Sequence, residues 1–144
     1  VIVFDQITKY LADNIISEQG VVHVLPYFNL TLAYNEGAAF SFLADAGGWQ
    51  RWFLTGLALI VSLVLVSMIK ALDAHEKWQA ISLSLILGGA IGNVIDRIIH
   101  GHVIDFLDVY YQEHHWPAFN IADSAISIGV AMLLIEMVFF KTGS

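Results

Sequence analysis

Three long stretches without charge dominate the pattern of hydrophobic and polar positions. Residues 52–69 and 78–95 contain no charged side chain, and residues 116–135 contain only Asp123. Each stretch is close to the roughly 20 residues that an α-helix needs to cross a ~30 Å hydrocarbon core. The pattern therefore predicts membrane-spanning helices over roughly 51–70, 78–98 and 119–140.

A fourth span is expected at the start of the chain. Residues 1–4 are apolar and the first charge is Asp5. This is the pattern of the last turns of a helix whose beginning is missing, and we place its end near residue 12. The predicted fold class is an all-α membrane protein with four transmembrane helices, the first one truncated, forming one domain over residues 1–144.

A period of two replaces the helical pattern before the second span. From Phe28 to Asn35 the side chains at even positions are apolar, and those between them are mostly polar. Such alternation is typical of a half-buried strand. We therefore expect a small extracytoplasmic β element over roughly 21–43, resting on the helices.

The distribution of Lys and Arg predicts the orientation in the membrane, because short cytoplasmic loops carry an excess of both. Residues 100–120 contain neither. We therefore place residues 13–50 and 98–120 outside. The inner side is marked by Lys70, Lys77 and Lys141, and the exceptions near the outer side are Lys9, Arg51 and Arg97.

Composition excludes several classes of function. The chain is 58% hydrophobic and 13% charged, which is too apolar for an ordinary soluble domain. It has no cysteine, so disulfides, thiolate catalysis and Cys-based metal sites are excluded. Its formal net charge of −7 argues against nucleic acid as a partner, because binding to phosphates needs a basic surface.

Two carboxylates lie at the rims of the apolar stretches. Ionisable groups at membrane depth are costly and persist mainly where they pair, line a water-filled cavity or do chemistry. Asp105 is by default a solvated loop acid, and Asp123, three residues after Asn120, also fits a helix-capping box. The functional interpretation gains weight because both aspartates lie on the same predicted side of the membrane, beside Asn93 and Arg97.

Other polar residues within or beside the spans have structural interpretations as well. Asp5 and Lys9 are four residues apart and can pair on one helix face. The run from Asn35 to Gly37 suits a turn. Asn93 lies deeper in a span, where an unsatisfied amide costs roughly several kcal/mol.

The histidines raise the possibility of a metal site. The outer segment offers side chains that zinc accepts as ligands, but their spacing is irregular. We favour the interpretation that they are interfacial polar residues, and we predict neither a metal nor a cofactor. The candidate ligands are His100, His102, His114 and His115, with Asp105, Asp108 and Glu113.

Five motifs in order resemble one known family. They are Asp5-x-x-Thr8-Lys9, Asn35-x-Gly37-Ala38-Ala39-Phe40-Ser41, Gly89-Ala90-x-Gly92-Asn93-x-x-Asp96-Arg97, Val103-x-Asp105-Phe106 and Phe119-Asn120-x-Ala122-Asp123. Together they span nearly the whole chain, and this order resembles lipoprotein signal peptidase, the type II signal peptidase of bacteria.

The resemblance implies an aspartic endopeptidase of the bacterial inner membrane, with its active site toward the outer, periplasmic face. Such an enzyme removes the signal peptide of a prolipoprotein, cutting before a cysteine that carries diacylglycerol, and globomycin-type cyclic peptides would block it. Membrane lipid would be the other partner, and the protein would be a monomer. The resemblance assigns catalysis to Asp105 and Asp123, substrate binding to Asn35, Gly37, Asn93, Arg97 and Asn120, and structural support to Asp5, Lys9 and Asp96.

Two other classes of protein are considered. A metal-binding membrane transporter would use the histidines and acids of the outer segment, and a chelator such as EDTA would abolish its function but not that of an aspartic dyad. A non-catalytic membrane scaffold would explain the glycines of the third span, but not the polar residues gathered at one level.

Overall fold

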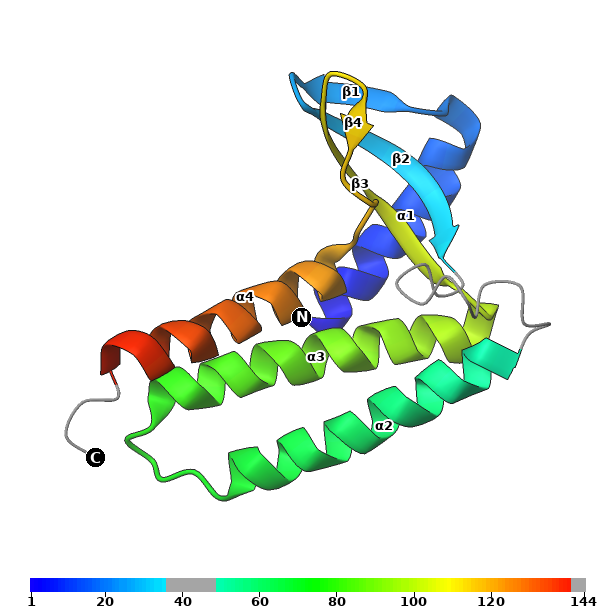
Figure 1. Ribbon diagram of the computed structural model, residues 1–144. Coiled ribbons are helices and arrows are strands. Elements are labelled where there is room, and N and C mark those ends of the chain that lie inside the picture. The colour runs from blue at the N-terminus through cyan, green and yellow to red at the C-terminus, as the bar shows by residue number, and fades with distance from the viewer. Residues whose placement is uncertain (36–48, 141–144) are drawn as a thin grey trace.

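The computed structural model describes residues 1–35 and 49–140. Within these ranges α2, α3 and α4 run side by side, with α3 between the other two, while α1 begins beside the middle of α3 and leads to a β-sheet on one side of this layer (Figure 1). The helices are α1 (Ile2–Gln19), α2 (Trp49–Lys70), α3 (Lys77–His100) and α4 (Ile121–Ile135), which continues as a π-helical turn (Glu136–Phe140). The strands are β1 (Val22–Leu25), β2 (Phe28–Asn35), β3 (Val103–Tyr111) and β4 (His114–His115).

Three of the described helices are long and apolar enough to cross a membrane. They are Trp49–Lys70, Lys77–His100 and Ile121–Phe139, with mean hydropathies of 2.4, 1.5 and 1.9. Most of their large apolar side chains are exposed, which fits lipid as the surrounding solvent, because water would leave these surfaces unfavourably hydrated.

The protein is not purely α-helical, so the predicted all-α class is wrong in this respect. An antiparallel sheet has the strand order β1-β2-β3-β4. β2 forms where the sequence alternates with a period of two, but β3 occupies a segment interpreted as a loop. The first four residues of β3, 103–106, are buried on both faces of the strand. The hydrophobic alternation that identifies a half-buried strand is therefore absent there.

The sheet packs on α1 through a small apolar core. The pairing of β2 with β3 places Ala33 opposite Asp105 and Asn35 opposite Val103. This register carries Asp105 to the end of the sheet where α3 leads into β3. The core consists of Ala12, Ile16 and Phe106, with Leu30, Leu32, Leu107 and Ile121 packed against it.

Glycines allow α3 to approach its neighbours closely. A Cβ atom added at Gly92 would lie 2.6 Å from Asp5 Oδ2, and one added at Gly89 would lie 2.5 Å from Ile126 Cγ1 and clash with the carbonyl oxygen of Ala122. Small residues at helix interfaces in membranes permit this close packing. The polar face of α1 is thereby brought against α3 and the start of α4.

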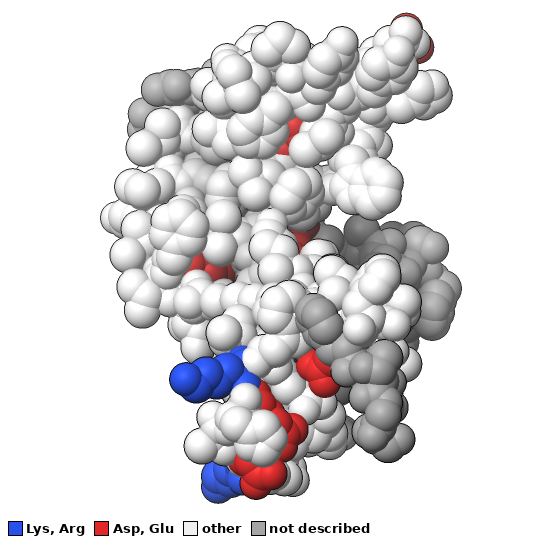
Figure 2. All heavy atoms as spheres, turned by 90° about the vertical axis from the view of Figure 1, so that its left-hand side faces the viewer, with Lys and Arg blue, Asp and Glu red and all other residues white. Residues whose placement is uncertain are grey.

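Arg51, one of the exceptions to the charge rule, is used in structural contacts. The guanidinium of Arg51 donates from Nε to Arg97 O at 2.6 Å and from Nη2 to Ile98 O, and it lies 4.5 Å from the ring centre of Trp52. It thus binds carbonyls in the last turn of α3, where cations are favoured. Figure 2 shows the end of the helix layer that lies away from Arg51, where Lys and Arg side chains lie at the lower edge of the view beside Asp and Glu.

The close approach of α3 to α4 predicts opposite effects for two glycine substitutions. Gly89→Ala should lower the free energy of unfolding by about 1–3 kcal/mol, because the added methyl group overpacks a closed interface. The measurement is thermal unfolding in detergent.

Gly56 in α2 is the matched control, since a Cβ added there meets nothing within 4 Å. Gly56→Ala should leave the unfolding temperature unchanged or raise it. Equal effects of the two substitutions would contradict the packing argument.

Candidate active site

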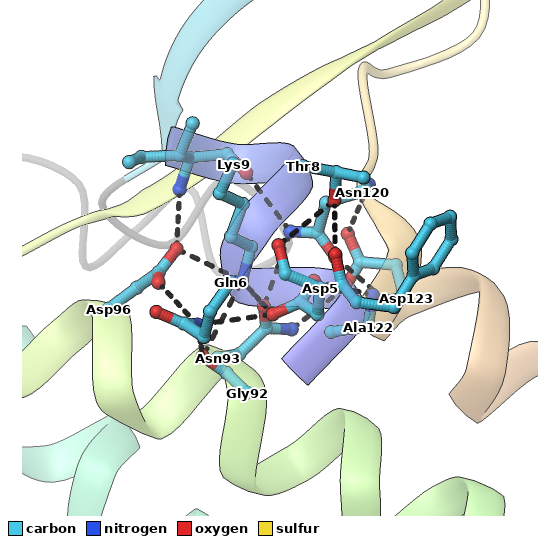
Figure 3. A network of polar contacts seen from close by, with 12 residues as sticks. Asp5, Gln6, Thr8, Lys9, Gly92, Asn93, Asp96, Asn120, Ala122 and Asp123 are labelled. Atoms are coloured by element: carbon cyan, nitrogen blue, oxygen red, sulfur yellow. Dashed lines mark hydrogen bonds and ion pairs between the residues drawn. The ribbon is translucent and has the colours of Figure 1, made fainter. Parts of the chain in front are cut away.

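Buried polar side chains gather where α1, α3, β3 and α4 meet (Figure 3). They come from segments far apart in the sequence, and each finds a hydrogen-bond partner, as buried polar groups in proteins generally do. The most buried of them are Asp5, Lys9, Asp96, Asp105 and Asn120, each at most 2% exposed.

A buried lysine forms the base of the cluster. The ammonium of Lys9 lies 2.8 Å from Asp5 Oδ2 and 3.0 Å from Asp96 Oδ2. The carboxylates also accept backbone donors: Asp5 Oδ1 from the N–H of Ala122, and Asp96 Oδ2 from the N–H of Ile104, both at 2.9 Å. These bonds fix α1 against the start of α4 and fix α3 against β3.

Asp123 lies in the first turn of α4 and takes part in its cap. The side chain of Asn120 accepts the N–H of Asp123 at 2.8 Å, and Asp123 Oδ2 accepts the N–H of Asn120 at 3.3 Å. This reciprocal pair is a capping box. The other oxygen, Oδ1, accepts from Asn93 Nδ2 at 2.9 Å. The structural and functional interpretations of Asp123 are therefore compatible.

Asp105 is a buried acid and not a solvated loop residue. Its Oδ1 accepts from Asn120 Nδ2 at 2.8 Å, and its Oδ2 accepts from Asn35 Nδ2 at 3.1 Å. Burial, together with the nearby charge of Asp123, raises the pKa of Asp105 to about 7. Burial disfavours the charged form of a carboxyl, and a second carboxylate close by adds to that effect.

Asn120 links the two carboxylates. Its side chain bonds Asp105 through Nδ2 and the N–H of Asp123 through Oδ1, and its own N–H bonds Asp123 Oδ2. Arg97 is half-buried and lies near both acids and Asp96. Its side chain makes no hydrogen bond or ion pair with another described residue. The cluster thus has two coupled acids and an available guanidinium.

Comparisons with known proteins agree with this geometry. The sequence profile of signal peptidase (SPase) II matches residues 1–139. Lipoprotein signal peptidase of Alteromonas mediterranea is 52% identical over 98% of this chain and 76% of its own length. That of Pseudomonas putida is 53% identical over 95% and 81%.

The chain belongs to the signal peptidase II family.

Solved structures share the fold. Two bacterial membrane enzymes determined by the in meso method at 1.9 and 2.3 Å resolution have TM-scores of 0.84 and 0.82, with 32% and 30% sequence identity. The first match covers 96% of this chain and 87% of the other, and the second covers 99% and 87%. The predicted family and the predicted class of enzyme, an aspartic signal peptidase, are therefore confirmed.

Most residues singled out in this signal peptidase from the sequence meet in one cluster. Asp5, Lys9, Asn35, Asn93, Asp96, Asp105, Asn120 and Asp123 are joined by the bonds described above, and Arg97 lies beside them. Gly37 and the motif residues that follow it, with Lys141, lie outside the described residues.

One contributor to the cluster escaped the sequence analysis. Gln6 Nε2 lies 3.0 Å from Gly92 O, 3.1 Å from Asp96 Oδ1 and 3.2 Å from Asp5 Oδ2. The NH2 group of Gln6 thus adds hydrogen bonds to oxygens whose lone pairs are not all used by the ammonium of Lys9. The available signal was a polar amide next to Asp5 in an otherwise apolar turn.

The outer histidines make local contacts in this signal peptidase. His115 Nδ1 lies 2.8 Å from Asp108 Oδ1, and the ring of His102 packs against Tyr34. Among residues 1–35 and 49–140, ligand atoms gather as for a metal only at Asp73, His75 and Glu76, in the α2–α3 connection. The transporter hypothesis therefore gains no support from the arrangement of the outer segment.

The bridging position of Asn120 predicts a double effect of Asn120→Ala. Loss of the cap should cost about 1 kcal/mol of stability. Loss of the amide that holds Asp105 should lower kcat about 100-fold, because small misplacements of reacting groups have effects of that size. Thermal unfolding and cleavage kinetics measure the two effects separately.

Ser124→Ala is the matched control, because among the described residues the hydroxyl of Ser124 bonds only the backbone oxygen of the N-cap residue, Asn120 O. It should change neither quantity appreciably. If Asn120→Ala lost stability but kept the wild-type kcat, Asn120 would be a cap and nothing more.

Proposed function

We propose that Asp105 and Asp123 are the catalytic dyad of this signal peptidase and that it cleaves prolipoproteins before a diacylglyceryl-modified cysteine. The relatives at 52% and 53% identity are lipoprotein signal peptidases. The observation that carries the assignment is that two carboxylates, one buried and one half-buried, both accept hydrogen bonds from Asn120 at the rim of a candidate span.

The dyad hydrolyses the peptide bond with one shared proton. Two close carboxylates cannot both ionise easily, so one is protonated at neutral pH. The ionised carboxylate takes a proton from water as the water oxygen bonds to the scissile carbonyl carbon. The protonated carboxyl donates its proton to the carbonyl oxygen. When the tetrahedral intermediate collapses, the C–N bond breaks, the leaving nitrogen receives the proton taken from water, and a hydroxyl group of the intermediate returns a proton to the carboxylate that had donated one, which restores the shared proton.

The surrounding residues divide into two groups. The NH2 groups of Asn35, Asn93 and Asn120 each donate to a carboxylate of the dyad. We assign them to the orientation of the dyad rather than to direct binding of the substrate. Arg97 retains its donors for a carbonyl of the extended substrate chain, which suits a planar guanidinium. Gly37 stays a predicted substrate-binding residue.

The substrate reaches the dyad from the membrane. A groove of about 480 Å³ has Asp123 in its lining, and the other lining side chains are mostly apolar or small. Its walls include the exposed side chains of Trp116 and Ile128, together with Phe119 and Ser127. The lipid of the modified cysteine would stay in the bilayer while the peptide bond enters the site.

The proposed setting is the bacterial inner membrane, with the dyad toward the periplasmic face. α1 is assigned as the fourth crossing helix beside the three candidate spans, and residues 1–144 form one peptidase domain that works as a monomer. The proposed orientation is supported by the distribution of Lys and Arg: Lys70 and Lys77 flank the α2–α3 connection at the end of the layer away from the dyad. Cytoplasmic loops are enriched in such residues.

Replacement of either dyad carboxyl should abolish cleavage. Asp105→Asn and Asp123→Asn keep the shape of the side chain and remove the proton-transferring group, so kcat should fall by at least about 100-fold. The measurement is cleavage of a diacylglyceryl-modified prolipoprotein in detergent or vesicles, with thermal unfolding to confirm the fold.

Asp108→Asn is the matched control on the same strand. Asp108 is buried as well, but it faces Asn29 and His115. The Asp108→Asn variant should cleave the substrate at near the wild-type rate. Near-wild-type cleavage by either dyad variant would refute the assignment.

The pH dependence of cleavage should be bell-shaped. The pKa of Asp105, raised to about 7 by burial and by Asp123, means that its proton is present at lower pH and lost as the pH rises through about 7. Activity that needs this proton therefore declines on the alkaline side, and activity that needs the ionised partner declines on the acid side. A rate that kept rising from pH 6 to pH 9 would contradict this assignment.

A further inference from the structure

The ammonium of Lys9 is placed to act on the dyad through Asn93. Besides its two carboxylate partners, Lys9 Nζ lies 3.0 Å from Asn93 Oδ1 and 3.5 Å from Gly92 O. An ammonium can only donate hydrogen bonds. The atom of Asn93 that faces Lys9 is therefore its amide oxygen.

Asn120 fixes the same orientation of Asn93 from the other side. The Oδ1 atom of Asn120 accepts the N–H of Asp123, which can only donate, so its Nδ2 faces Asn93 Oδ1 at 3.2 Å. With both donors on its oxygen, Asn93 directs its own NH2 group to Asp123 Oδ1 at 2.9 Å. Figure 3 shows this chain from Lys9 to Asp123.

Both carboxyls accept amide NH2 groups, Asp123 from Asn93 and Asp105 from Asn35 and Asn120, so it is the position of each carboxyl in the fold that distinguishes them. An NH2 group directed at a carboxylate oxygen stabilises the ionised form, whereas a carbonyl there would require a protonated carboxyl. Asp123 also lies in the first turn of α4, where the helix dipole favours an anion. Asp105 lies on strand β3 and not in the first turn of a helix.

We propose that Lys9 is a positioning residue of the dyad: by holding the amide of Asn93 in this orientation it keeps Asp123 ionised. Asp123 is then the group that takes the proton from water, and Asp105 is the group that donates one to the carbonyl oxygen. The inference rests on the proposed function and deepens it. The pKa of about 7 for Asp105 agrees with its role as the proton donor.

Among residues 1–35 and 49–140, the charges that act on the dyad lie on four elements, α1, α3, β3 and α4. They are Asp5 and Lys9 on α1, Asp96 and Arg97 on α3, Asp105 on β3 and Asp123 on α4.

Removal of Lys9 alone would leave Asp5 and Asp96 as unpaired buried carboxylates, which is strongly destabilising. The test therefore uses Asp96→Asn as its background. The pair Lys9→Met and Asp96→Asn leaves the net charge of this triad at −1, its wild-type value.

The experiment is a double-mutant cycle between Lys9 and Asn93 in the Asp96→Asn background. Lys9→Met should lower kcat about 100-fold with a smaller change in KM, and the acid limb of the kcat/KM profile should move to higher pH, because the anionic dyad has lost a stabilising donor. Adding Lys9→Met to Asn93→Ala should cause little further loss, because Lys9 acts through Asn93. Lys9→Arg, which keeps the charge and the donors, should partly restore kcat.

Two results would overturn the inference. One is that the double variant loses kcat by the product of the losses of Lys9→Met and Asn93→Ala, and the other is that the acid limb of the kcat/KM profile stays in place in Lys9→Met. A second measurement uses the wild-type protein and so does not depend on any variant folding. The side-chain amide resonances of Asn93 in ¹⁵N-labelled protein should shift over the pH range in which the acid limb falls, and the absence of a shift would also overturn it. If Asp105→Asn and Asp123→Asn were active, the proposed function would fail; if they were inactive while the cycle was additive, only the role of Lys9 would fail.

Discussion

The site depends on the burial of one ammonium group between two carboxylates. A charge taken out of water costs several kcal/mol unless a partner of opposite charge and further hydrogen bonds replace the lost solvent. Lys9 therefore requires Asp5 and Asp96 beside it, at 2.8 and 3.0 Å. These acids in turn hold backbone N–H groups of α4 and β3. A single neutralised charge thus fixes the relative positions of the elements that carry the dyad.

The same constraint explains why the cluster contains so many amides. A carboxylate pair at the edge of a membrane needs uncharged hydrogen-bond donors. Cationic partners for both carboxylates would remove the difference in ionisation between them. Asparagine supplies such donors, and Asn120 donates to both carboxyls, to Asp105 from its side chain and to Asp123 from its backbone N–H, while capping α4. Structure and catalysis share these bonds, so the cap and the dyad cannot be separated physically.

The hydrophobic periodicity of the sequence predicted the membrane helices and strand β2, but it missed strand β3. The alternation from Phe28 to Asn35 indicated β2, and long apolar runs indicated membrane helices. β3 escaped because its first residues, 103–106, are buried on both faces, so no alternation exists there. Asp105 was consequently interpreted as a solvated loop acid by default. Its burial follows from the pairing of β3 with β2 and from the contact of the sheet with α1.

By itself the sequence determined which chemical groups are present, the lengths of the apolar helices, and, through five ordered motifs, the family. These properties are local or additive along the chain. Tertiary structure decided which groups meet, since Lys9 and Asp96 are distant in sequence, and which way each amide faces. It also decided the difference between the two aspartates, because desolvation and hydrogen bonding depend on every neighbour in space. No spacing in the sequence encodes that sum.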